Sequence, residues 1–297
     1  MQFSSKGWKY WARLLLAAVV STLLVVAMTV VLLSYQHATG YLHPQRAISS
    51  GDYLREHGIA FQNIDLITED NVRLSAWYTP PQNEAVILVA HGYGASRPEE
   101  FYEIFASHGY GVLAWDFRAH GASGGDFSSL GYYEILDVKA ALDFALAQPG
   151  VEHVGAWGGS MGAVTTIRAA AQYPDIEAVI ADSPYASLKE EMNVLVPFPL
   201  MRPLIRFFAQ QESGVDVDWV RPIDDISKIS PRPVFIIQGL HDGMVQLDSA
   251  QRLYDAAGDP RALWTEPGVP HLNMYSYYPK EYIRKAIKFF DGYLLNK

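Results

Sequence analysis

The chain of 297 residues contains no cysteine. Disulfide bonds, a cysteine nucleophile and thiolate metal sites are therefore excluded, and the packed core must stabilise the fold. Basic residues are not concentrated either, since the 23 lysines and arginines form no long run in a chain of net charge −9. Because the sequence offers no cluster of basic residues that could bind the phosphates of a nucleic acid, we expect no nucleic-acid partner.

Familiar ligand-binding motifs are missing as well. The nine histidines form no H-E-x-x-H pattern or comparable close-set metal cluster, and no G-x-x-x-x-G-K-S/T loop is present. We therefore expect no metal and no cofactor, and nothing in the sequence points to a protein partner. With 49% hydrophobic and 19% charged residues, the composition is that of an ordered protein rather than a disordered one.

One segment departs from globular composition. Residues 14–33 contain no charge, no glycine and no proline, and a helix of this length spans roughly 30 Å, the thickness of the hydrocarbon core of a bilayer. Lys6, Lys9 and Arg13 precede the run, and the next lysine or arginine is Arg46. This distribution of charge favours a cytoplasmic N-terminus.

The chain divides into three parts on this pattern. Residues 1–33 are the predicted cytoplasmic N-terminus and single transmembrane anchor. Residues 34–57 lack an apolar period and are a predicted linker, and residues 58–297 are a predicted globular domain on the extracytoplasmic side of the cell membrane. A cleaved signal peptide and a buried core helix remain alternatives for the apolar run, although the apolar region of a signal peptide has only about 7 to 15 residues.

Short apolar runs alternate with helix-like segments after residue 80. Because the runs are too uniformly apolar to be half exposed, they predict a mostly parallel sheet with helices on both faces, an α/β fold. Two β-rich runs around the turn at 69–71 predict an antiparallel hairpin at the sheet edge. In such sheets ligands bind beyond the carboxyl ends of the strands. The six apolar runs cover residues 85–90, 111–116, 151–158, 177–182, 233–239 and 262–266.

The connection between the runs at 177–182 and 233–239 is unusually long. Its residues 186–219 are rich in leucine, valine, phenylalanine, methionine and proline. A long loop within a compact domain is uncommon unless it is a lid or a binding element. We interpret residues 186–225 as a small, partly helical cap. The alternative is a loop that only packs over an edge of the sheet.

A serine lies between two glycines where a predicted strand meets a predicted helix. Gly158, Ser160 and Gly162 form a G-x-S-x-G pattern. A sharp strand-to-helix turn needs positions without side chains before and after the serine, and it presents the hydroxyl above the carboxyl edge of the sheet. In this context the sequence resembles the α/β-hydrolase superfamily, and the resemblance covers about residues 60–295.

The resemblance implies an α/β-hydrolase fold and a catalytic triad in the chain order serine, acid, histidine. Asp242 follows the run at 233–239 and His271 follows the run at 262–266, where this order requires them. His271 would take the proton of Ser160 as general base, and Asp242 would hold the imidazole in the required tautomer.

Other residues remain alternatives for these roles. Asp182 also ends a predicted strand and is an alternative acid. His91, His120 and His241 are alternatives for the base. The glycine-rich surroundings of His120 resemble a loop-shaping motif of the superfamily, so we expect a structural role for it.

The resemblance also implies two backbone donors for the oxyanion. One is the N–H of Met161, directly after the serine, and the other is the N–H of Tyr93 in the H-G-Y-G segment at residues 91–94. The alternative for this segment is an ordinary glycine turn.

These features together are typical of a membrane-anchored serine hydrolase that cleaves a carboxylic ester through an acyl-enzyme on Ser160. An apolar cap close to a membrane favours an apolar acyl group, in a small-molecule or lipid ester. Aminopeptidases and acyl-peptide hydrolases share the resemblance and remain an alternative. A non-catalytic binding protein is a second alternative, because a fold does not establish a function.

Overall fold

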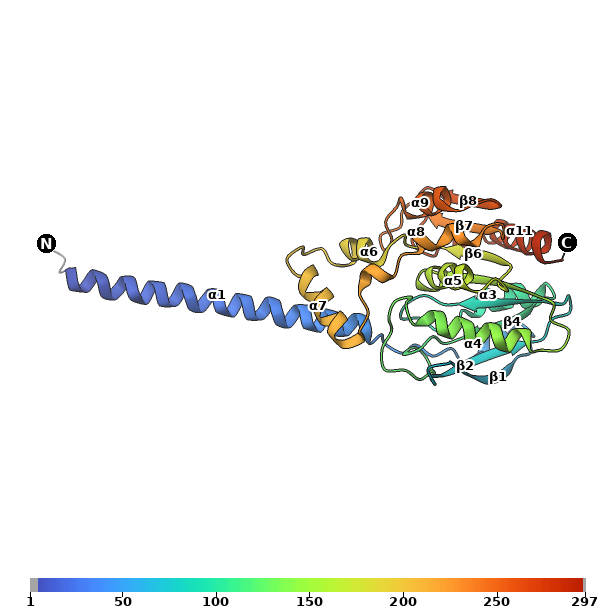
Figure 1. The fold of residues 1–297 in the computed structure, drawn as a ribbon, viewed down its shortest axis with the longest axis horizontal. Coiled ribbons are helices and arrows are strands. Elements are labelled where there is room, and N and C mark those ends of the chain that lie inside the picture. Colours follow the sequence, from blue (N-terminus) through green and yellow to red (C-terminus); the bar gives the residue numbers. More distant parts are fainter. Residues whose placement is uncertain (1–4, 296–297) are drawn as a thin grey trace.

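The computed structural model describes residues 5–295, with side chains from residue 7 onward, so Lys6 of the basic cluster lies outside the described side chains. Helix α1 (Ser5–Leu42) extends as a rod from one end of the molecule, and the α/β domain lies at its C-terminal end (Figure 1). Its stretch Gly7–Leu42 has a mean hydropathy of 2.7 in its most apolar window, and none of that window is buried. In length and composition, the helix suffices to cross a membrane.

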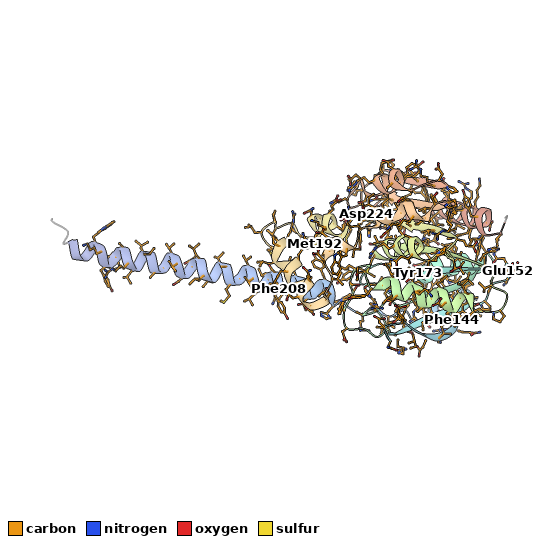
Figure 2. The ribbon with its side chains drawn as sticks, in the orientation of Figure 1. Phe144, Glu152, Tyr173, Met192, Phe208 and Asp224 are labelled. Carbon is orange, nitrogen blue, oxygen red and sulfur yellow. The ribbon has the colours of Figure 1, made fainter. Side chains whose placement is uncertain are left out.

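The side chains of α1 project on all sides along most of its length (Figure 2). A buried core helix would hide such side chains, so that alternative does not fit the structure. The helix continues to Leu42, through the first residues of the predicted linker 34–57. These residues pack against another part of the chain, since Ala38 is fully buried and Leu42 is 4% exposed.

Eight strands form one sheet in the order β1-β2-β4-β3-β5-β6-β7-β8. Strand β2 is antiparallel to both neighbours, β1 and β4, and all other pairs are parallel. The predicted mostly parallel sheet with an antiparallel hairpin at its edge is therefore confirmed. The strands are β1 (Gln62–Ile67), β2 (Arg73–Thr79), β3 (Ala85–Ala90), β4 (Gly111–Trp115), β5 (His153–Gly159), β6 (Ala178–Asp182), β7 (Val234–Gly239) and β8 (Arg261–Glu266).

Helices cover both faces of the sheet, which explains why its central strands are apolar throughout. In β3, Val86 and Leu88 belong to the cluster on one face and Ile87 and Val89 to the cluster on the other, because side chains alternate along a strand. All four side chains are fully buried. The first face is covered by α4 (Glu134–Leu146), α5 (Met161–Gln172) and α9 (Ser249–Ala256), and the second by α3 (Glu99–Ser107) and α11 (Pro279–Phe290).

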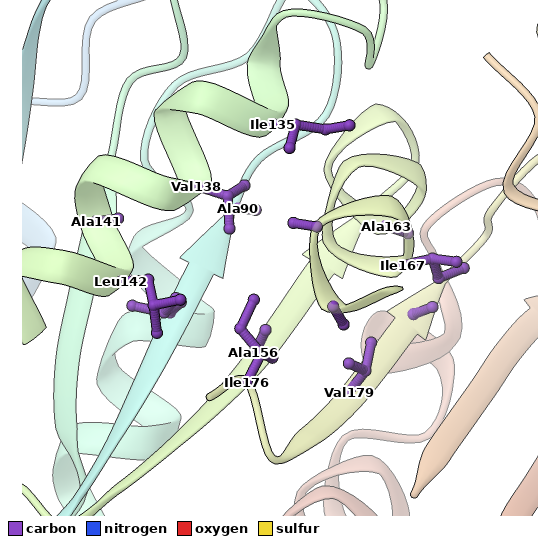
Figure 3. Packing of buried hydrophobic residues seen from close by; sticks show 14 of the residues in the cluster. Ala90, Ile135, Val138, Ala141, Leu142, Ala156, Ala163, Ile167, Ile176 and Val179 are labelled. Atoms are coloured by element: carbon purple, nitrogen blue, oxygen red, sulfur yellow. The ribbon is translucent and has the colours of Figure 1, made fainter. Parts of the chain in front are cut away.

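The packing between helices and strands is close on the first face. Figure 3 shows Val138 and Leu142 of α4 and Ile167 of α5 directed at the strands beneath them. The remaining short elements lie outside the run of strands: α2 (Asp52–Glu56) precedes β1, whereas α10 (Met274–Tyr277) and the π-helical turn η3 (Asp291–Leu295) follow β8.

The long insertion between β6 and β7 is partly helical. Its helices α6 (Leu188–Leu195) and α7 (Arg202–Ser213) lie on the side of the domain toward α1 (Figure 1), and α7 contacts α1 directly. Met192 and Phe208, marked in Figure 2, belong to the apolar cluster that joins the insertion to the end of α1. The insertion continues through η1 (Val217–Trp219), α8 (Pro222–Asp225) and η2 (Ile226–Ile229).

Candidate active site

The turn at Ser160 joins β5 to α5. Ser160 has φ 53° and ψ −117°, a positive-φ conformation that residues other than glycine rarely adopt and that persists where the surrounding structure enforces it. Its backbone N–H donates a hydrogen bond of 2.8 Å to the carbonyl oxygen of Asp182, at the end of the neighbouring strand β6. The hydroxyl is therefore held at the carboxyl edge of the sheet.

Two glycines permit this turn because no side chain fits at either position. A Cβ atom on Gly158 would lie 2.4 Å from the carbonyl oxygen of Gly162. A Cβ atom on Gly162 would lie 2.3 Å from the carbonyl oxygen of Ala90 in β3. The glycines of the G-x-S-x-G pattern are thus required by close approach of backbone segments.

The structure brings the three predicted triad side chains together. His271 Nε2 lies 3.0 Å from Ser160 Oγ, and His271 Nδ1 lies 2.7 Å from Asp242 Oδ2. A carboxylate only accepts hydrogen bonds, so Nδ1 carries the proton and Nε2 accepts from the serine hydroxyl. This is the arrangement in which an imidazole can withdraw the serine proton.

The loops after β7 and β8 fix the positions of Asp242 and His271 relative to each other. Asp242 Oδ1 accepts the backbone N–H groups of Met244 (2.8 Å) and Val245 (2.9 Å), and its side chain is fully buried. The backbone N–H of His241 donates to the carbonyl oxygen of Val269 (3.0 Å), which ties one loop to the other. The carboxylate therefore has a fixed orientation toward the imidazole.

The alternative acid, Asp182, is hydrogen-bonded elsewhere. Its carboxylate accepts the hydroxyl of Ser183 (2.9 Å) and the hydroxyl of Tyr282 in α11 (2.8 Å). Burial raises the pKa of Asp182 to about 6. Neither carboxylate oxygen is bonded to His271, so Asp182 links α11 to the sheet instead.

Among the described residues, none of the alternative bases is hydrogen-bonded to Ser160. His91 is buried, its Nε2 accepts the backbone N–H of Phe117 (2.9 Å), and burial lowers its pKa to about 3, so it stays neutral. His120 is buried in the loop after β4, with Nδ1 2.8 Å from the carbonyl oxygen of Arg118, and burial lowers its pKa as well. His241 is exposed.

The H-G-Y-G segment lies directly beside the serine. A Cβ atom on Gly92 would lie 3.4 Å from Ser160 Cβ, and Tyr93 and Met161 line the same pocket as Ser160. Within the described residues, neither the N–H of Tyr93 nor that of Met161 donates a hydrogen bond. Both groups are therefore free to bind an oxygen atom of a ligand.

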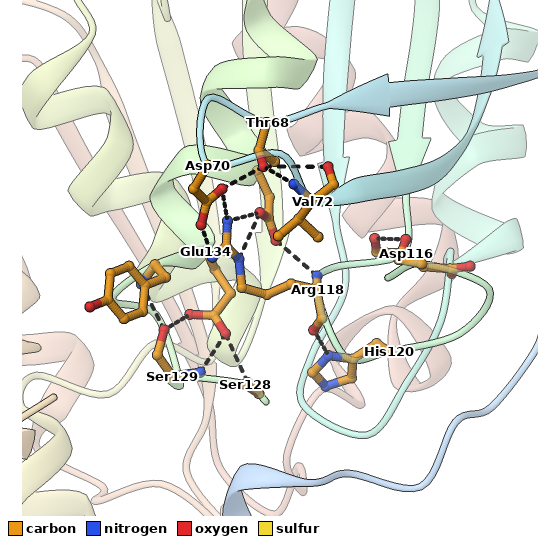
Figure 4. A network of polar contacts seen from close by, with 12 residues as sticks. Thr68, Asp70, Val72, Asp116, Arg118, His120, Ser128, Ser129 and Glu134 are labelled. Carbon is orange, nitrogen blue, oxygen red and sulfur yellow. Dashed lines mark hydrogen bonds and ion pairs between the residues drawn. The ribbon is translucent and has the colours of Figure 1, made fainter. Parts of the chain in front are cut away.

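A buried ionic network holds the loop after β4. Arg118 forms ion pairs with Asp137 and Asp70, each at 2.7 Å, and Glu134 accepts hydrogen bonds from two serine hydroxyls of the loop (Figure 4). Leu130, in the same loop, lines the pocket of Ser160. Because breaking a buried ion pair is strongly unfavourable, we expect this wall of the pocket to be rigid.

Ser160 opens into a cavity of about 160 Å³, here called the nucleophile pocket. Its walls come from the end of α1, the loops after β3 and β4, the cap and the Asp242 loop. Most of the lining side chains are apolar or aromatic, as in typical small-molecule sites. The pocket is lined by Tyr41, Tyr93, Leu130, Ser160, Met161, Tyr185, Leu188, Glu191, Leu195, Met244 and Val245.

Sequence reasoning missed several residues of this pocket, Tyr41 and Glu191 among them. Tyr41 belongs to the predicted linker, and no local pattern places it at the site. Glu191 lies on cap helix α6 and is 3% exposed, and burial raises its pKa to about 7. Its Oε2 atom accepts the backbone N–H of Gln246 at 3.4 Å, which connects the cap to the loop of Asp242. The signal in the sequence is helical spacing, because Glu191 lies three residues after Leu188 and four before Leu195, on one face of α6.

The described part of the chain contains no group of three His, Asp or Glu side chains close enough to hold a metal ion. The expectations of no metal and no cofactor stay predictions. What the site offers chemically is a hydroxyl, an imidazole and a carboxylate in series, next to two free backbone donors. Such a set can carry out nucleophilic attack on a carbonyl carbon.

The chain is similar to one family model and to several known proteins. Residues 81–220 match the family model of the serine aminopeptidases S33, a range that contains Ser160 and ends before Asp242 and His271. The chain is 29% identical over 227 residues to the uncharacterized protein YqkD of Bacillus subtilis, covering 72% of this chain and 73% of that protein. It is 28% identical over 240 residues to the lysophosphatidylserine lipase ABHD12 of Mus musculus, covering 67% of this chain and 57% of that protein.

Among solved structures, an esterase of Pyrococcus furiosus superposes with a TM-score of 0.72 at 26% sequence identity, covering 85% of this chain and 99% of that chain. The ferulic-acid-bound Est1E of Butyrivibrio proteoclasticus superposes with a TM-score of 0.61 at 20% identity, a likeness of fold alone. The strand order, the strained turn at Ser160 and these similarities lead to one conclusion: the chain has the α/β-hydrolase fold and is similar to members of that superfamily.

Proposed function

We propose that the protein is a membrane-anchored serine hydrolase that cleaves a carboxylic ester through an acyl-enzyme on Ser160. The observation that carries the proposal is the hydrogen-bonded series Ser160, His271, Asp242 at a strained turn beside two free backbone donors. A serine hydroxyl is a poor nucleophile near neutral pH, so an adjacent base is the feature that separates a reactive serine from an ordinary one.

In the first half of the reaction, Ser160 Oγ attacks the ester carbonyl carbon while His271 Nε2 takes the hydroxyl proton. Asp242 stabilises the imidazolium without taking the proton itself. The carbonyl oxygen becomes an oxyanion that accepts hydrogen bonds from the N–H groups of Tyr93 and Met161. The carbon–oxygen bond to the alcohol then breaks, and the alcohol leaves with the proton held by His271.

In the second half, water attacks the acyl-enzyme. His271 takes a proton from the water, a second oxyanion forms in the same place, and the bond to Ser160 Oγ breaks. The carboxylic acid leaves, and Ser160 recovers its proton from the imidazolium. No further reactant is consumed, so the site is ready for another cycle.

An ester is our first choice of substrate because the nucleophile pocket is lined mainly by apolar side chains. The names of two similar proteins, an esterase and a lysophosphatidylserine lipase, support the same choice. An aminopeptidase is the second candidate, favoured by the match to the S33 family model. A third candidate is a binding protein without catalytic activity, which requires that Ser160 does not react with substrates.

We also propose that α1 anchors the protein, with the N-terminus in the cytoplasm and the domain of residues 58–297 on the other side of the membrane. The exposed apolar surface of α1 and the basic residues Lys9 and Arg13 near its N-terminal end support this orientation. The cap of residues 186–225 faces the same side as α1 and exposes Phe198 and Leu200, the second with 85% of its surface. An apolar tip of this kind suits the membrane interface.

The test is covalent labelling of the full-length protein in detergent with a fluorophosphonate probe. We expect wild type to be labelled, and Ser160→Ala and His271→Ala to lose labelling although they remain folded. p-Nitrophenyl esters and aminoacyl anilides then separate an esterase from an aminopeptidase. A folded wild type that neither reacts with the probe nor hydrolyses either substrate class contradicts the proposal and leaves the binding protein.

A further inference from the structure

The C-terminal end of α1 has a carbonyl group that the helix itself cannot pair. The last four carbonyl groups of a helix find no N–H donor within the same helix. Four positions after Gly40 the chain has Pro44, which lacks an N–H, so even a longer helix would leave the Gly40 carbonyl without a partner. The partner comes from the domain instead, because the hydroxyl of Tyr93 donates a hydrogen bond of 2.7 Å to this oxygen.

The end of α1 is held against the domain on both sides of Gly40. Ala38 is fully buried in the apolar cluster that it shares with the cap helices. The carbonyl oxygen of Leu42 accepts the backbone N–H of Ser128 (2.8 Å), in the loop after β4. Ser128 is itself hydrogen-bonded to Glu134 of the buried ionic network (Figure 4). The Gly40 carbonyl is therefore an acceptor in a fixed place.

The segment that carries the Tyr93 N–H needs restraint, because Gly92 and Gly94 flank it. Gly94 has φ 70°, and nothing lies within 4 Å of a Cβ atom added there. One restraint comes from His91. Its Nε2 accepts from Phe117, so its Nδ1 carries the proton and donates to the carbonyl oxygen of Gly92 (2.7 Å). That carbonyl and the Tyr93 N–H belong to one planar peptide unit.

The side chain of Tyr93 supplies a second restraint. Its ring packs edge to face against the ring of His120, with 5.7 Å between the centroids. Burial raises the pKa of Tyr93 to about 12, so the hydroxyl keeps its proton and remains a donor. The hydrogen bond to Gly40 therefore ties the segment beside Ser160 to the end of α1.

We propose that the hydroxyl of Tyr93, bound to the Gly40 carbonyl of α1, positions the backbone N–H of Tyr93 for the oxyanion. Tyr93 is then a positioning residue through its side chain and an oxyanion donor through its backbone. The inference rests on the proposed function, because it assumes that an oxyanion forms beside Ser160. It makes the rate of the reaction depend on how α1 is attached to the domain.

The first test removes one hydroxyl from the full-length protein in detergent, with p-nitrophenyl butyrate as substrate. Tyr93→Phe keeps the ring and the backbone N–H but loses the bond to Gly40. Because the oxyanion is absent from the bound substrate, a displaced donor should lower kcat and leave KM nearly unchanged. Removal of an oxyanion donor lowers kcat about 10²- to 10³-fold, so we expect a smaller loss of about tenfold where the donor is only less well held.

Tyr110→Phe is the matched control. Tyr110 also donates a hydrogen bond, of 2.6 Å, to Asp291 Oδ1. It directly precedes β4, whereas Ser160 directly follows the parallel strand β5, so the two residues lie at opposite edges of the sheet. The same chemical change at Tyr110 should leave kcat equal to that of wild type.

A double-mutant cycle tests the part assigned to α1. Ala38→Trp should displace the end of α1 from the cap because Ala38 is fully buried, whereas Ala17→Trp adds the same side chain at an exposed position of the helix. Ala38→Trp should lower kcat in the wild-type background and cause little further loss in Tyr93→Phe, since both changes break the same bond. Ala17→Trp should leave kcat unchanged. Ala38→Leu decides the case if the tryptophan variant does not fold.

Each result has a distinct meaning. A kcat of Tyr93→Phe equal to that of wild type, a change in KM alone, or an equal loss of kcat in Tyr110→Phe overturns the inference. A loss in Tyr93→Phe without a loss in the Ala38 variants, or losses that multiply in the double variant, overturns the part assigned to α1. Wild type that neither reacts with the fluorophosphonate probe nor hydrolyses the ester overturns the proposed function instead.

Discussion

Two buried carboxyl groups lie close to the imidazole, and their hydrogen bonds distinguish them. Asp242 accepts from His271, whereas Asp182 accepts from Tyr282 and Ser183. Residues of the same type at the ends of two parallel strands therefore have different expected roles. One orients the base, and the other joins a helix to the sheet.

We expect Asp242→Asn to lower kcat about 10³- to 10⁴-fold, because an amide favours the wrong tautomer of His271. Asp182→Asn should instead lower the free energy of unfolding by about 1–3 kcal/mol through the buried hydrogen bonds it disturbs. Ester hydrolysis and urea unfolding, measured on both variants, check these outcomes. A loss of kcat in Asp182→Asn as large as in Asp242→Asn would reverse the assignment.

The buried carboxyl of Glu191 makes stability depend on pH. Burial raises its pKa from 4.5 to about 7, so the folded state binds the proton more tightly than the unfolded state. The stabilisation is complete below pH 4.5 and is lost as the pH rises through 7, and at 1.36 kcal/mol per pH unit it amounts to about 3 kcal/mol.

Glu191→Gln should remove this dependence, because the amide stays neutral. We expect the variant to gain stability relative to wild type by up to about 3 kcal/mol between pH 4.5 and pH 8. Urea unfolding of the full-length protein in detergent, followed by tryptophan fluorescence, measures the difference. Parallel stability curves for the two proteins across this range would show that Glu191 is not the titrating group.

At the scale of elements, the turn between β5 and α5 depends on backbone contact with β3. The carbonyl oxygen of Ala90 occupies the space that a Cβ atom on Gly162 would need. Strand and helix can meet at this angle only while the position lacks a side chain. Ser160 is therefore positioned by neighbouring backbone segments rather than by contacts of its own side chain.

Gly162→Ala should destabilise the fold by roughly 2 kcal/mol or more and reduce fluorophosphonate labelling, because the added methyl group must displace backbone. Gly292→Ala, at a position where nothing lies within 4 Å of the added atom, is the matched control. Thermal unfolding and the rate of labelling provide the comparison. Equal stability of the two variants would mean that the turn has more freedom than the contact distances imply.

At the scale of the whole molecule, α1 joins the domain to its proposed place at the membrane. Arg46 follows the helix and donates a hydrogen bond to the carbonyl oxygen of Gly125 (3.1 Å), so the chain beyond α1 stays attached to the domain surface. The cap faces α1 in the same view (Figure 1). The orientation of α1 would therefore decide the surroundings of the entire site.

Because the chain has no cysteine, single introduced thiols report the orientation cleanly. In intact cells, we expect a membrane-impermeant maleimide to label Glu69→Cys, on the exposed surface of the domain, and not Ser5→Cys. Permeabilised cells should show labelling of both, which is the control for reactivity. Labelling of Ser5→Cys alone in intact cells would invert the proposed topology.

Much of this architecture can be predicted from the amino-acid sequence. The uniformly apolar runs predict strands buried on both faces, and the β-rich hairpin at residues 62–79 predicts the antiparallel edge, because both patterns depend on local sequence. Helix α11 and the extension of α1 to Leu42 lie outside the predicted helices. Their stability comes from packing, Tyr282 against the sheet and Ala38 against the cap, which no local pattern reports.

The sequence by itself determined the order of the elements, the turn at Ser160 and the candidate positions of the acid and the histidine, because strand periodicity and glycine requirements act over a few residues. Only the tertiary structure decided which carboxylate reaches His271, which residue of the cap is buried beside it, and that Tyr41 lines the pocket. Those outcomes depend on contacts between segments as far apart as Ser160 and His271, and distances of that kind exist only after the chain has folded.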